Sequence, residues 1–178
     1  MLRKIISLLC LSIFLAGPAS ARKVIHNHLK LMNESINLEL RVIRGIKVYY
    51  PKSQEHRLAH VEKTLGDLKI ILPVSKDSCR DIELNIFLLP DNILNNREIM
   101  HFMSWDNWGG YDVWGAYDAF HNPKIGEMMI NTDASDTRMS NTLGHEWYHH
   151  HQTATCKKRS EDGVDNFERR FCEISSTC

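Results

Sequence analysis

Residues 137–152 have the sequence TRMSNTLGHEWYHHHQ, and this stretch predicts a long helix around which the rest of the chain is organised. It contains no proline and a single glycine, Gly144, and residues 133–136 supply short polar side chains suited to a helix N-cap. An apolar stripe recurs every four residues and comprises Met139, Leu143 and Trp147. A polar stripe on another side of the helix comprises Asn141, His145, His149 and Gln152.

Residues 145–149, HEWYH, follow the pattern HExxH. Residues four apart lie one above the other on a helix, so the imidazoles of His145 and His149 can reach one metal ion. Zn²⁺ accepts neutral histidine nitrogens, and a catalytic zinc keeps a fourth position for water beside three protein ligands. Glu146, next to the first histidine, can take a proton from that water as general base. The pattern favours a zinc-dependent hydrolase, usually a peptidase.

Residues 141–151 together with Glu168 resemble the gluzincin branch of the HExxH zinc metallopeptidases, or zincins, of a small secreted type. In that branch the third zinc ligand is a glutamate on a following helix, roughly twenty residues after the second histidine. Glu168 lies 19 residues after His149. The residues at helical spacing around it are Phe167, Phe171 and Ile174. The resemblance therefore implies one zinc ion held by His145, His149 and Glu168.

The chain departs from the related branches at several positions. Gln152 and Thr155 stand where the metzincin pattern has glycine and a third histidine, which argues against that branch. Phe167 and Cys172 stand where the thermolysin type has an asparagine and an aspartate, so other acids stay open as third ligand. These other candidates are Glu161, Glu173, Asp162 and Asp165.

The segment just before the helix, residues 125–131, is short and apolar and suits a β-strand. The resemblance implies that this strand is the edge of the sheet and pairs with an extended peptide substrate, a mode of recognition that uses main-chain hydrogen bonds. An ordinary core strand is the alternative that the composition leaves open.

The first 21 residues have the pattern of a secretory signal peptide. Arg3 and Lys4 precede an apolar stretch, residues 5–15, and Ala19-Ser20-Ala21 suits a cleavage site. The apolar stretch is shorter than the roughly 20 residues of a membrane span. We therefore expect a secreted or periplasmic protein without a membrane anchor after cleavage. The remaining residues, 22–178, are expected to form one domain; they carry 20 basic and 22 acidic side chains, and this balance does not suggest nucleic-acid binding.

Four cysteines remain after the signal peptide: Cys79, Cys156, Cys172 and Cys178. In an exported chain an even number predicts two disulfides, and four cysteines allow three pairings. A bridge from Cys156 to Cys172 would join the two expected ligand-bearing helices. We therefore predict that pairing, which leaves Cys79 with Cys178.

The remaining patterns predict an α+β fold. Alternation indicates one long bulged strand or two strands over residues 36–50 and a strand over 81–89, while an apolar stripe indicates a helix over 53–72. Together with the resemblance, these elements imply a single zincin-like domain in which a small mixed sheet packs on the HExxH helix and a C-terminal helix.

Residues 101–121 are rich in aromatic residues and glycines. Aromatic side chains on a glycine-containing loop often line a binding site, and they equally often cover a sheet as core. Tyr111 and Tyr117 are candidates to donate a hydrogen bond to an oxyanion, without a pattern that selects between them.

Two classes of function follow. The first is a secreted zinc peptidase that acts on a peptide or protein substrate, with Glu146 as general base. The alternative is a catalytically inactive zinc-binding interaction protein on the same scaffold. The glutamate of the motif favours the enzyme, because metal binding alone does not require that carboxylate.

Overall fold

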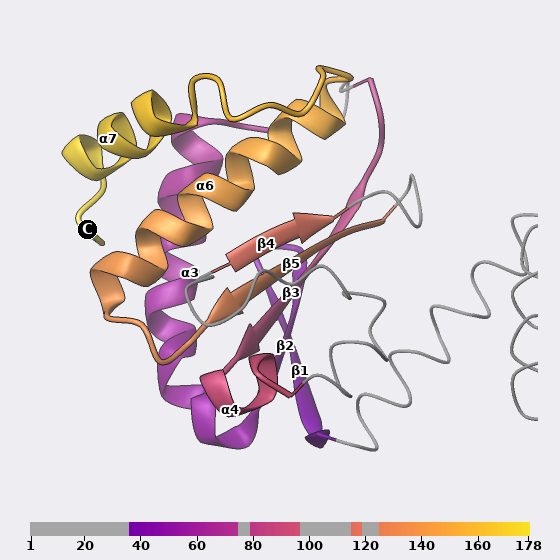
Figure 1. The fold of residues 1–178 in the computed structure, drawn as a ribbon, viewed down its shortest axis with the longest axis vertical. Coiled ribbons are helices and arrows are strands. Elements are labelled where there is room, and N and C mark those ends of the chain that lie inside the picture. Colours follow the sequence, from indigo (N-terminus) through magenta and orange to yellow (C-terminus); the bar gives the residue numbers. More distant parts are fainter. Residues whose placement is uncertain (1–35, 75–78, 97–114, 119–124) are drawn as a thin grey trace, which may run out of the picture.

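The computed structural model describes residues 36–74, 79–96, 115–118 and 125–178, and these residues have a mixed α+β architecture (Figure 1). One five-stranded sheet has the strand order β1-β2-β3-β5-β4. The strands are β1 (Leu38–Ile43), β2 (Ile46–Pro51), β3 (Glu83–Leu89), β4 (Gly115–Asp118) and β5 (Ile125–Asn131). The helices are the 3₁₀-helix η1 (Lys52–Arg57) and the α-helices α3 (Leu58–Ile71), α4 (Asp91–Leu94), α6 (Asp136–Ala154) and α7 (Val164–Ile174). The expected mixed sheet with a long helix and a C-terminal helix is confirmed.

The first predicted strand region forms two antiparallel strands. β1 and β2 are joined by a two-residue turn, and Ile43 pairs with Ile46. Arg44 and Gly45 in the turn both have positive φ, 51° and 82°, the backbone conformation that matches the twist of a tight hairpin. β2 and β3 then pair in parallel, as do β3 and β5.

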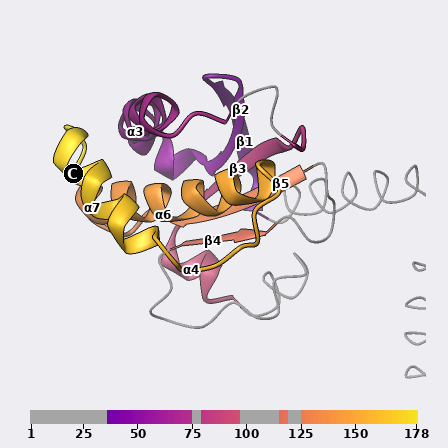
Figure 2. The same cartoon turned by 90° about the horizontal axis from the view of Figure 1, so that it is seen from above.

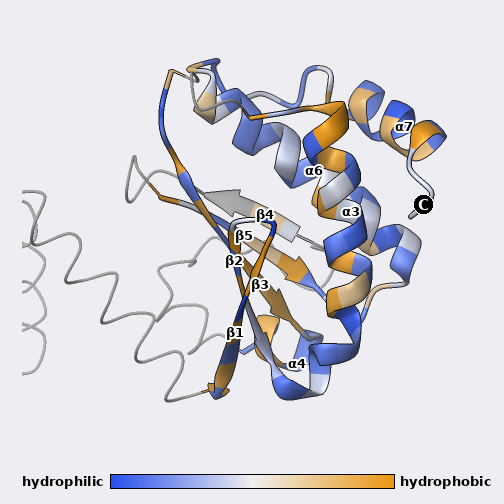
Figure 3. Ribbon diagram, turned by 180° about the vertical axis from the view of Figure 1, so that it is seen from behind, coloured by the Kyte–Doolittle hydropathy of each residue, from blue (hydrophilic) through white to orange (hydrophobic). Residues whose placement is uncertain are grey.

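Helices α3 and α6 pack on one face of this sheet (Figure 2). The predicted apolar stripe of α3 is buried, as is that of α6, and both contribute to one core with the inward side chains of the sheet. Figure 3 shows hydrophobic residues gathered along the central strands β3 and β5. The indole of Trp147 donates a hydrogen bond to the Leu72 carbonyl oxygen at the end of α3, 2.9 Å away, which satisfies its only polar atom. The core therefore fixes how α6 is rotated about its axis.

Helix α6 begins as the sequence predicts. Ser135 is the N-cap, and its side chain accepts a hydrogen bond from the Arg138 amide. The helix then runs for 19 residues without interruption. At its start the polar face is tied to α3, because His60 lies 2.8 Å from the Ser140 hydroxyl.

The expectation that residues 125–131 form the edge of the sheet is wrong. β5 has β3 on one side and β4 on the other, antiparallel to β4. Within the described residues β4 is the edge strand on this side. The short strand that covers β5 comes from the aromatic and glycine-rich stretch, whose pattern gave no indication of a strand.

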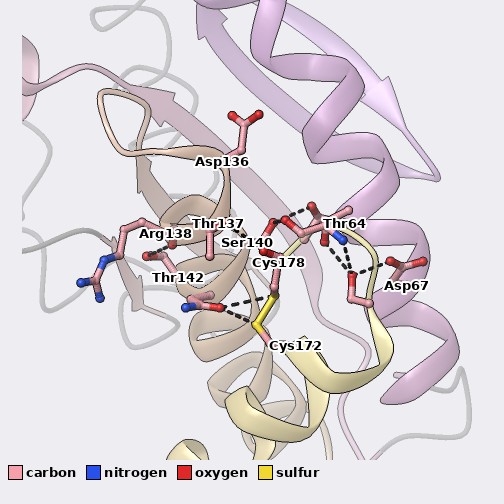
Figure 4. Close-up of a disulfide and its surroundings, with 12 residues drawn as sticks. Thr64, Asp67, Asp136, Thr137, Arg138, Ser140, Thr142, Cys172 and Cys178 are labelled. Atoms are coloured by element: carbon pink, nitrogen blue, oxygen red, sulfur yellow. Dashed lines mark hydrogen bonds between the residues drawn. A yellow bond between two sulfur atoms is a disulfide. The ribbon is translucent and has the colours of Figure 1, made fainter.

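The predicted disulfide pairing is also wrong, although both disulfides form. Cys79 pairs with Cys156, and Cys172 pairs with Cys178. Helix α7 packs against the first half of α6, so that Cys172 lies beside Asn141. Figure 4 shows Cys172 and Cys178 next to this part of α6. Cys156 lies two residues after Ala154, the last residue of α6, which is 13 residues or about 20 Å from Asn141 along the helix axis. It lies instead beside residues 79–80, where the Arg80 amide donates to the Ala154 carbonyl oxygen.

Among the described residues, no helix is long and apolar enough to cross a membrane. The predicted signal peptide lies outside the described residues, as does most of the aromatic stretch 101–121, Tyr111 included.

Candidate metal centre

The two histidines of the HExxH pattern face each other on α6. Their rings lie edge to face with centroids 4.9 Å apart, and the two Nε2 atoms are 3.2 Å apart. His149 is fully buried, while His145 is partly exposed. The helical spacing expected from the sequence thus brings one nitrogen of each ring to the same point.

The other nitrogen of each ring has its own partner. Nδ1 of His145 lies 2.7 Å from the Glu168 carboxylate of α7, and Nδ1 of His149 lies 3.1 Å from the Gln152 side-chain oxygen. A carboxylate and an amide oxygen can only accept, so each Nδ1 carries the proton that it donates. When both rings are neutral, both Nε2 atoms then have lone pairs directed at a common position, which a cation can occupy.

Glu161 completes this position from the loop between α6 and α7. One oxygen of its carboxylate lies 3.3 Å from Nε2 of His145, and the other lies 3.3 Å from Nε2 of His149. The carboxylate is 72% exposed, so it approaches the histidines from the solvent side. Two imidazoles and a carboxylate therefore surround one point.

Glu168 has a different position from the one expected for the third ligand. It contacts Nδ1 of His145, on the opposite side of the ring from Nε2. The other acids considered from the sequence, Asp162, Asp165 and Glu173, are exposed on the loop and on α7. Of the five acids, only Glu161 reaches both Nε2 atoms.

Helix α7 comes close to α6 because Gly144 has no side chain. A Cβ atom at position 144 would lie 3.2 Å from the ring of Phe171, which is fully buried. This close packing brings Glu168, about one turn earlier on α7, to the ring of His145. Gly144, the weak point of the helix by propensity, thus has a packing role.

Glu146 lies on α6 next to His145 and is 5% exposed. Its Oε2 atom is buried and has no hydrogen-bond partner among the described residues. Burial raises the pKa of this carboxyl to about 7, and the nearby His145 and Arg159 oppose the shift. A cation at the adjacent position would lower that pKa and favour the carboxylate. A buried oxygen without a hydrogen-bond partner destabilises the folded state. Such an oxygen is typical of a group that binds a ligand or water.

The pKa values of His145 and His149 are shifted in opposite directions. The hydrogen bond to Glu168 raises the pKa of His145, while burial opposes it. Burial lowers the pKa of His149, so that ring is neutral near pH 7. His150 is buried against Trp147, with ring centroids 5.6 Å apart, and burial lowers its pKa to about 4. It belongs to the packing of the helix.

The donor set fits a zinc ion. Ligand atoms about 2.0 to 2.2 Å from one ion lie about 3.3 to 3.6 Å apart at a tetrahedral angle, close to the 3.2 and 3.3 Å separations observed here. Two histidines and one carboxylate are also a ligand set of catalytic zinc. Glu146 offers a further oxygen close by, since ligand atoms of His145, Glu146 and His149 lie within 4.8 Å of one another.

Strand β4 passes directly over this part of α6. A Cβ atom on Gly115 would lie 2.2 Å from Cγ2 of Thr142 and 3.4 Å from Cγ of Glu146. The edge strand thus runs along the helix beside the candidate base. The sequence gave no indication of this contact. It also gave none of the hydrogen bond between Gln152 and His149, although the two residues are three positions apart on the predicted helix.

No protein-family model matches the chain, and no curated protein or solved structure is significantly similar to it.

Proposed function

We propose that the protein is a zinc-dependent hydrolase of amide bonds, a secreted peptidase with a zincin-like active site. The observation that carries this proposal is the convergence of the Nε2 atoms of His145 and His149, which lie 3.2 Å apart. Their Nδ1 atoms are both occupied by acceptors. Such an arrangement is the usual preparation of histidines for a metal ion.

His145, His149 and Glu161 would hold the zinc ion, and Glu168 would orient the ring of His145. Glu161 takes the third-ligand role that the spacing had given to Glu168. When bound, zinc would polarise the scissile carbonyl and lower the pKa of a coordinated water toward 7.

Glu146 is the general base in this proposal. Its buried Oε2 atom has no partner among the described residues, so it is free to accept the proton of the attacking water. It would then pass this proton to the leaving amine. Glu146 is buried on α6, and burial limits its exchange of protons with bulk solvent.

The substrate would be an extended peptide alongside β4, the edge strand of the described sheet. β4 pairs with β5 through its backbone on one side, and its contact with Thr142 brings it next to Glu146. Pairing with a strand edge aligns a peptide through main-chain hydrogen bonds, without requiring a particular side chain. In this proposal the substrate therefore pairs with β4, and not with β5 as expected from the sequence.

Export is the remaining part of the proposal. The signal-peptide pattern of residues 1–21 supports it, and two disulfides are typical of an oxidising compartment.

The test is to measure zinc content and peptide hydrolysis on folded, disulfide-bonded protein that has been purified without chelators. One equivalent of zinc and cleavage of a quenched-fluorescent peptide library, both lost in His145→Ala and His149→Ala, are expected. Zinc binding without hydrolysis of any library member would favour the inactive binding protein instead. Absence of bound metal after incubation with Zn²⁺ would contradict the proposal as a whole.

A further inference from the structure

Gln152 lies near the end of α6 and is 5% exposed. Its side-chain amide contacts two different parts of the candidate centre. The oxygen Oε1 lies 3.1 Å from Nδ1 of His149. On the loop that carries Glu161, Nε2 of Gln152 donates to the Ser160 carbonyl oxygen at 3.1 Å, and the Ser160 amide donates to Oε1 at 3.4 Å.

The backbone of Ser160 fixes which way the amide of Gln152 points. A carbonyl oxygen can only accept and a backbone amide can only donate, so the NH₂ group must face the former and Oε1 the latter. Oε1 has no proton, and Nδ1 of His149 is therefore the donor in their hydrogen bond. The proton of the neutral ring lies on Nδ1, and Nε2 has its lone pair directed toward His145 and Glu161.

The same amide holds the loop at the residue before Glu161. The Glu161 carboxylate is 72% exposed, so burial does not fix its position. The loop is fastened at its start by the disulfide between Cys79 and Cys156, and the Lys157 amide donates to the backbone oxygen of Gln152 at 2.8 Å. The paired hydrogen bonds to Ser160 fasten it again next to Glu161.

We propose that Gln152 is a positioning residue that prepares two of the three metal ligands at once. It sets the tautomer of His149 and holds the Glu161 loop against the histidines. The inference rests on the proposed metal site and adds to it a residue outside the HExxH pattern. It requires that the polar atoms of Gln152, and not its volume, determine metal affinity.

Two substitutions separate these possibilities. Gln152→Met keeps an unbranched side chain of similar length and removes every hydrogen-bonding atom, whereas Gln152→Glu keeps an acceptor for Nδ1 of His149. Loss of a group that orients a ligand typically costs 10- to 100-fold in metal affinity, so Gln152→Met should bind Zn²⁺ about 10- to 100-fold more weakly than wild type. Gln152→Glu should recover the part of this loss that comes from His149, but not the part that comes from the loop, because a carboxylate cannot donate to the Ser160 carbonyl oxygen. A role in packing alone predicts the reverse order, because methionine is the better core residue and glutamate adds a buried charge.

Thr153→Val is the matched control. The Thr153 hydroxyl donates to the backbone oxygen of His149, so valine removes a hydrogen bond to the same residue without touching its ring. Zn²⁺ affinity, measured by competition with a chromophoric chelator, should be unchanged in this variant. Wild-type affinity in Gln152→Met, or weaker binding by Gln152→Glu than by Gln152→Met, would overturn the inference and leave the proposed metal site intact. Failure of the wild-type protein to bind Zn²⁺ would instead remove the proposed function.

A second measurement needs no substitution. Long-range ¹H–¹⁵N correlation spectra of the metal-free wild-type protein at neutral pH report which nitrogen of each neutral histidine is protonated. His149 is expected to carry its proton on Nδ1. A ring protonated on Nε2 would contradict the inference, even if Gln152→Met did not fold.

Discussion

The Glu168 carboxylate lies 2.7 Å from Nδ1 of His145, whereas Glu161 lies 3.3 Å from Nε2 of the same ring. The two nitrogens are on opposite sides of the imidazole. A group bound to Nδ1 therefore does not share an ion with Nε2, and the two glutamates have different roles. In the proposed site Glu161 would be a ligand of the zinc ion, and Glu168 would be the acceptor that orients His145.

Glu161→Ala should lower Zn²⁺ affinity more than Glu168→Ala, because only the first substitution removes a ligand. Loss of the orienting group in Glu168→Ala should cost about 10- to 100-fold. In cobalt-substituted protein, Glu161→Ala should also change the visible absorption bands, which report the ligand set, and Glu168→Ala should leave their positions unchanged. Glu173→Ala, on the exposed side of α7, is the control and should behave as wild type. Wild-type affinity and spectrum in Glu161→Ala would return the third-ligand role to another acid.

Gly115→Ala should destabilise the protein through its contact with α6. The added Cβ atom would lie 2.2 Å from Cγ2 of Thr142, and overpacking of this kind typically costs about 1 to 3 kcal/mol. Without the contact, alanine would be the better strand residue by about 0.5 to 1 kcal/mol. The sign of the change in the free energy of unfolding, measured in urea, therefore tests whether β4 lies against α6.

Thr142→Ser provides the matched rescue. Serine keeps the hydroxyl that donates to the Arg138 carbonyl oxygen and removes the Cγ2 methyl group. Gly115→Ala should be tolerated in the Thr142→Ser background. Equal destabilisation in both backgrounds would show that the cost has another origin.

The parts of the fold that could be predicted are those in which the local sequence pattern and the tertiary packing favour the same secondary structure. The N-cap and the apolar stripe of α6 were both visible in the sequence, because each depends on residues within a few positions of one another. The edge strand was not predictable, since β4 has only four residues and its neighbour in the sheet is decided by tertiary packing. β5 is an interior strand because β4 pairs with it, so its place in the sheet could not be predicted either.

For the candidate site, the sequence could predict which residues lie close together, but not which of their atoms are in contact. Helical spacing predicted that the rings of His145 and His149 lie side by side with Glu146 next to them, and the structure has this arrangement. Glu168, chosen for its distance of 19 residues from His149, lies next to His145. Spacing could not decide which nitrogen of the ring Glu168 would contact. Glu161 lies in a loop, where no periodicity indicates the direction of a side chain, and only the three-dimensional course of the chain brings it to the histidines.

The disulfide pairs should differ in their contribution to stability. In the loop-entropy model a bridge between residues 77 apart, as in Cys79–Cys156, contributes about 4.5 kcal/mol, and one between residues 6 apart, as in Cys172–Cys178, about 2 kcal/mol. Replacing both cysteines of the first pair by serine should therefore lower the free energy of unfolding more than replacing both of the second. Urea unfolding of the two double variants measures this difference.

Peptide mapping of the unreduced protein tests the pairing itself. Peptides that link Cys79 to Cys156 and Cys172 to Cys178 are expected. A peptide that links Cys156 to Cys172 would contradict the structure of the loop that carries Glu161.

The most direct test of the proposed chemistry is Glu146→Gln, compared with wild type for zinc content and peptide hydrolysis on the same preparation. Glutamine keeps the size of the side chain but cannot accept a proton from the attacking water, and loss of a general base typically lowers the rate by 10²-fold or more. Because Glu146 is not a ligand in this account, bound zinc should stay at one equivalent while kcat/KM falls at least about 100-fold. Hydrolysis by Glu146→Gln at the wild-type rate would contradict the proposal that this carboxylate drives the reaction.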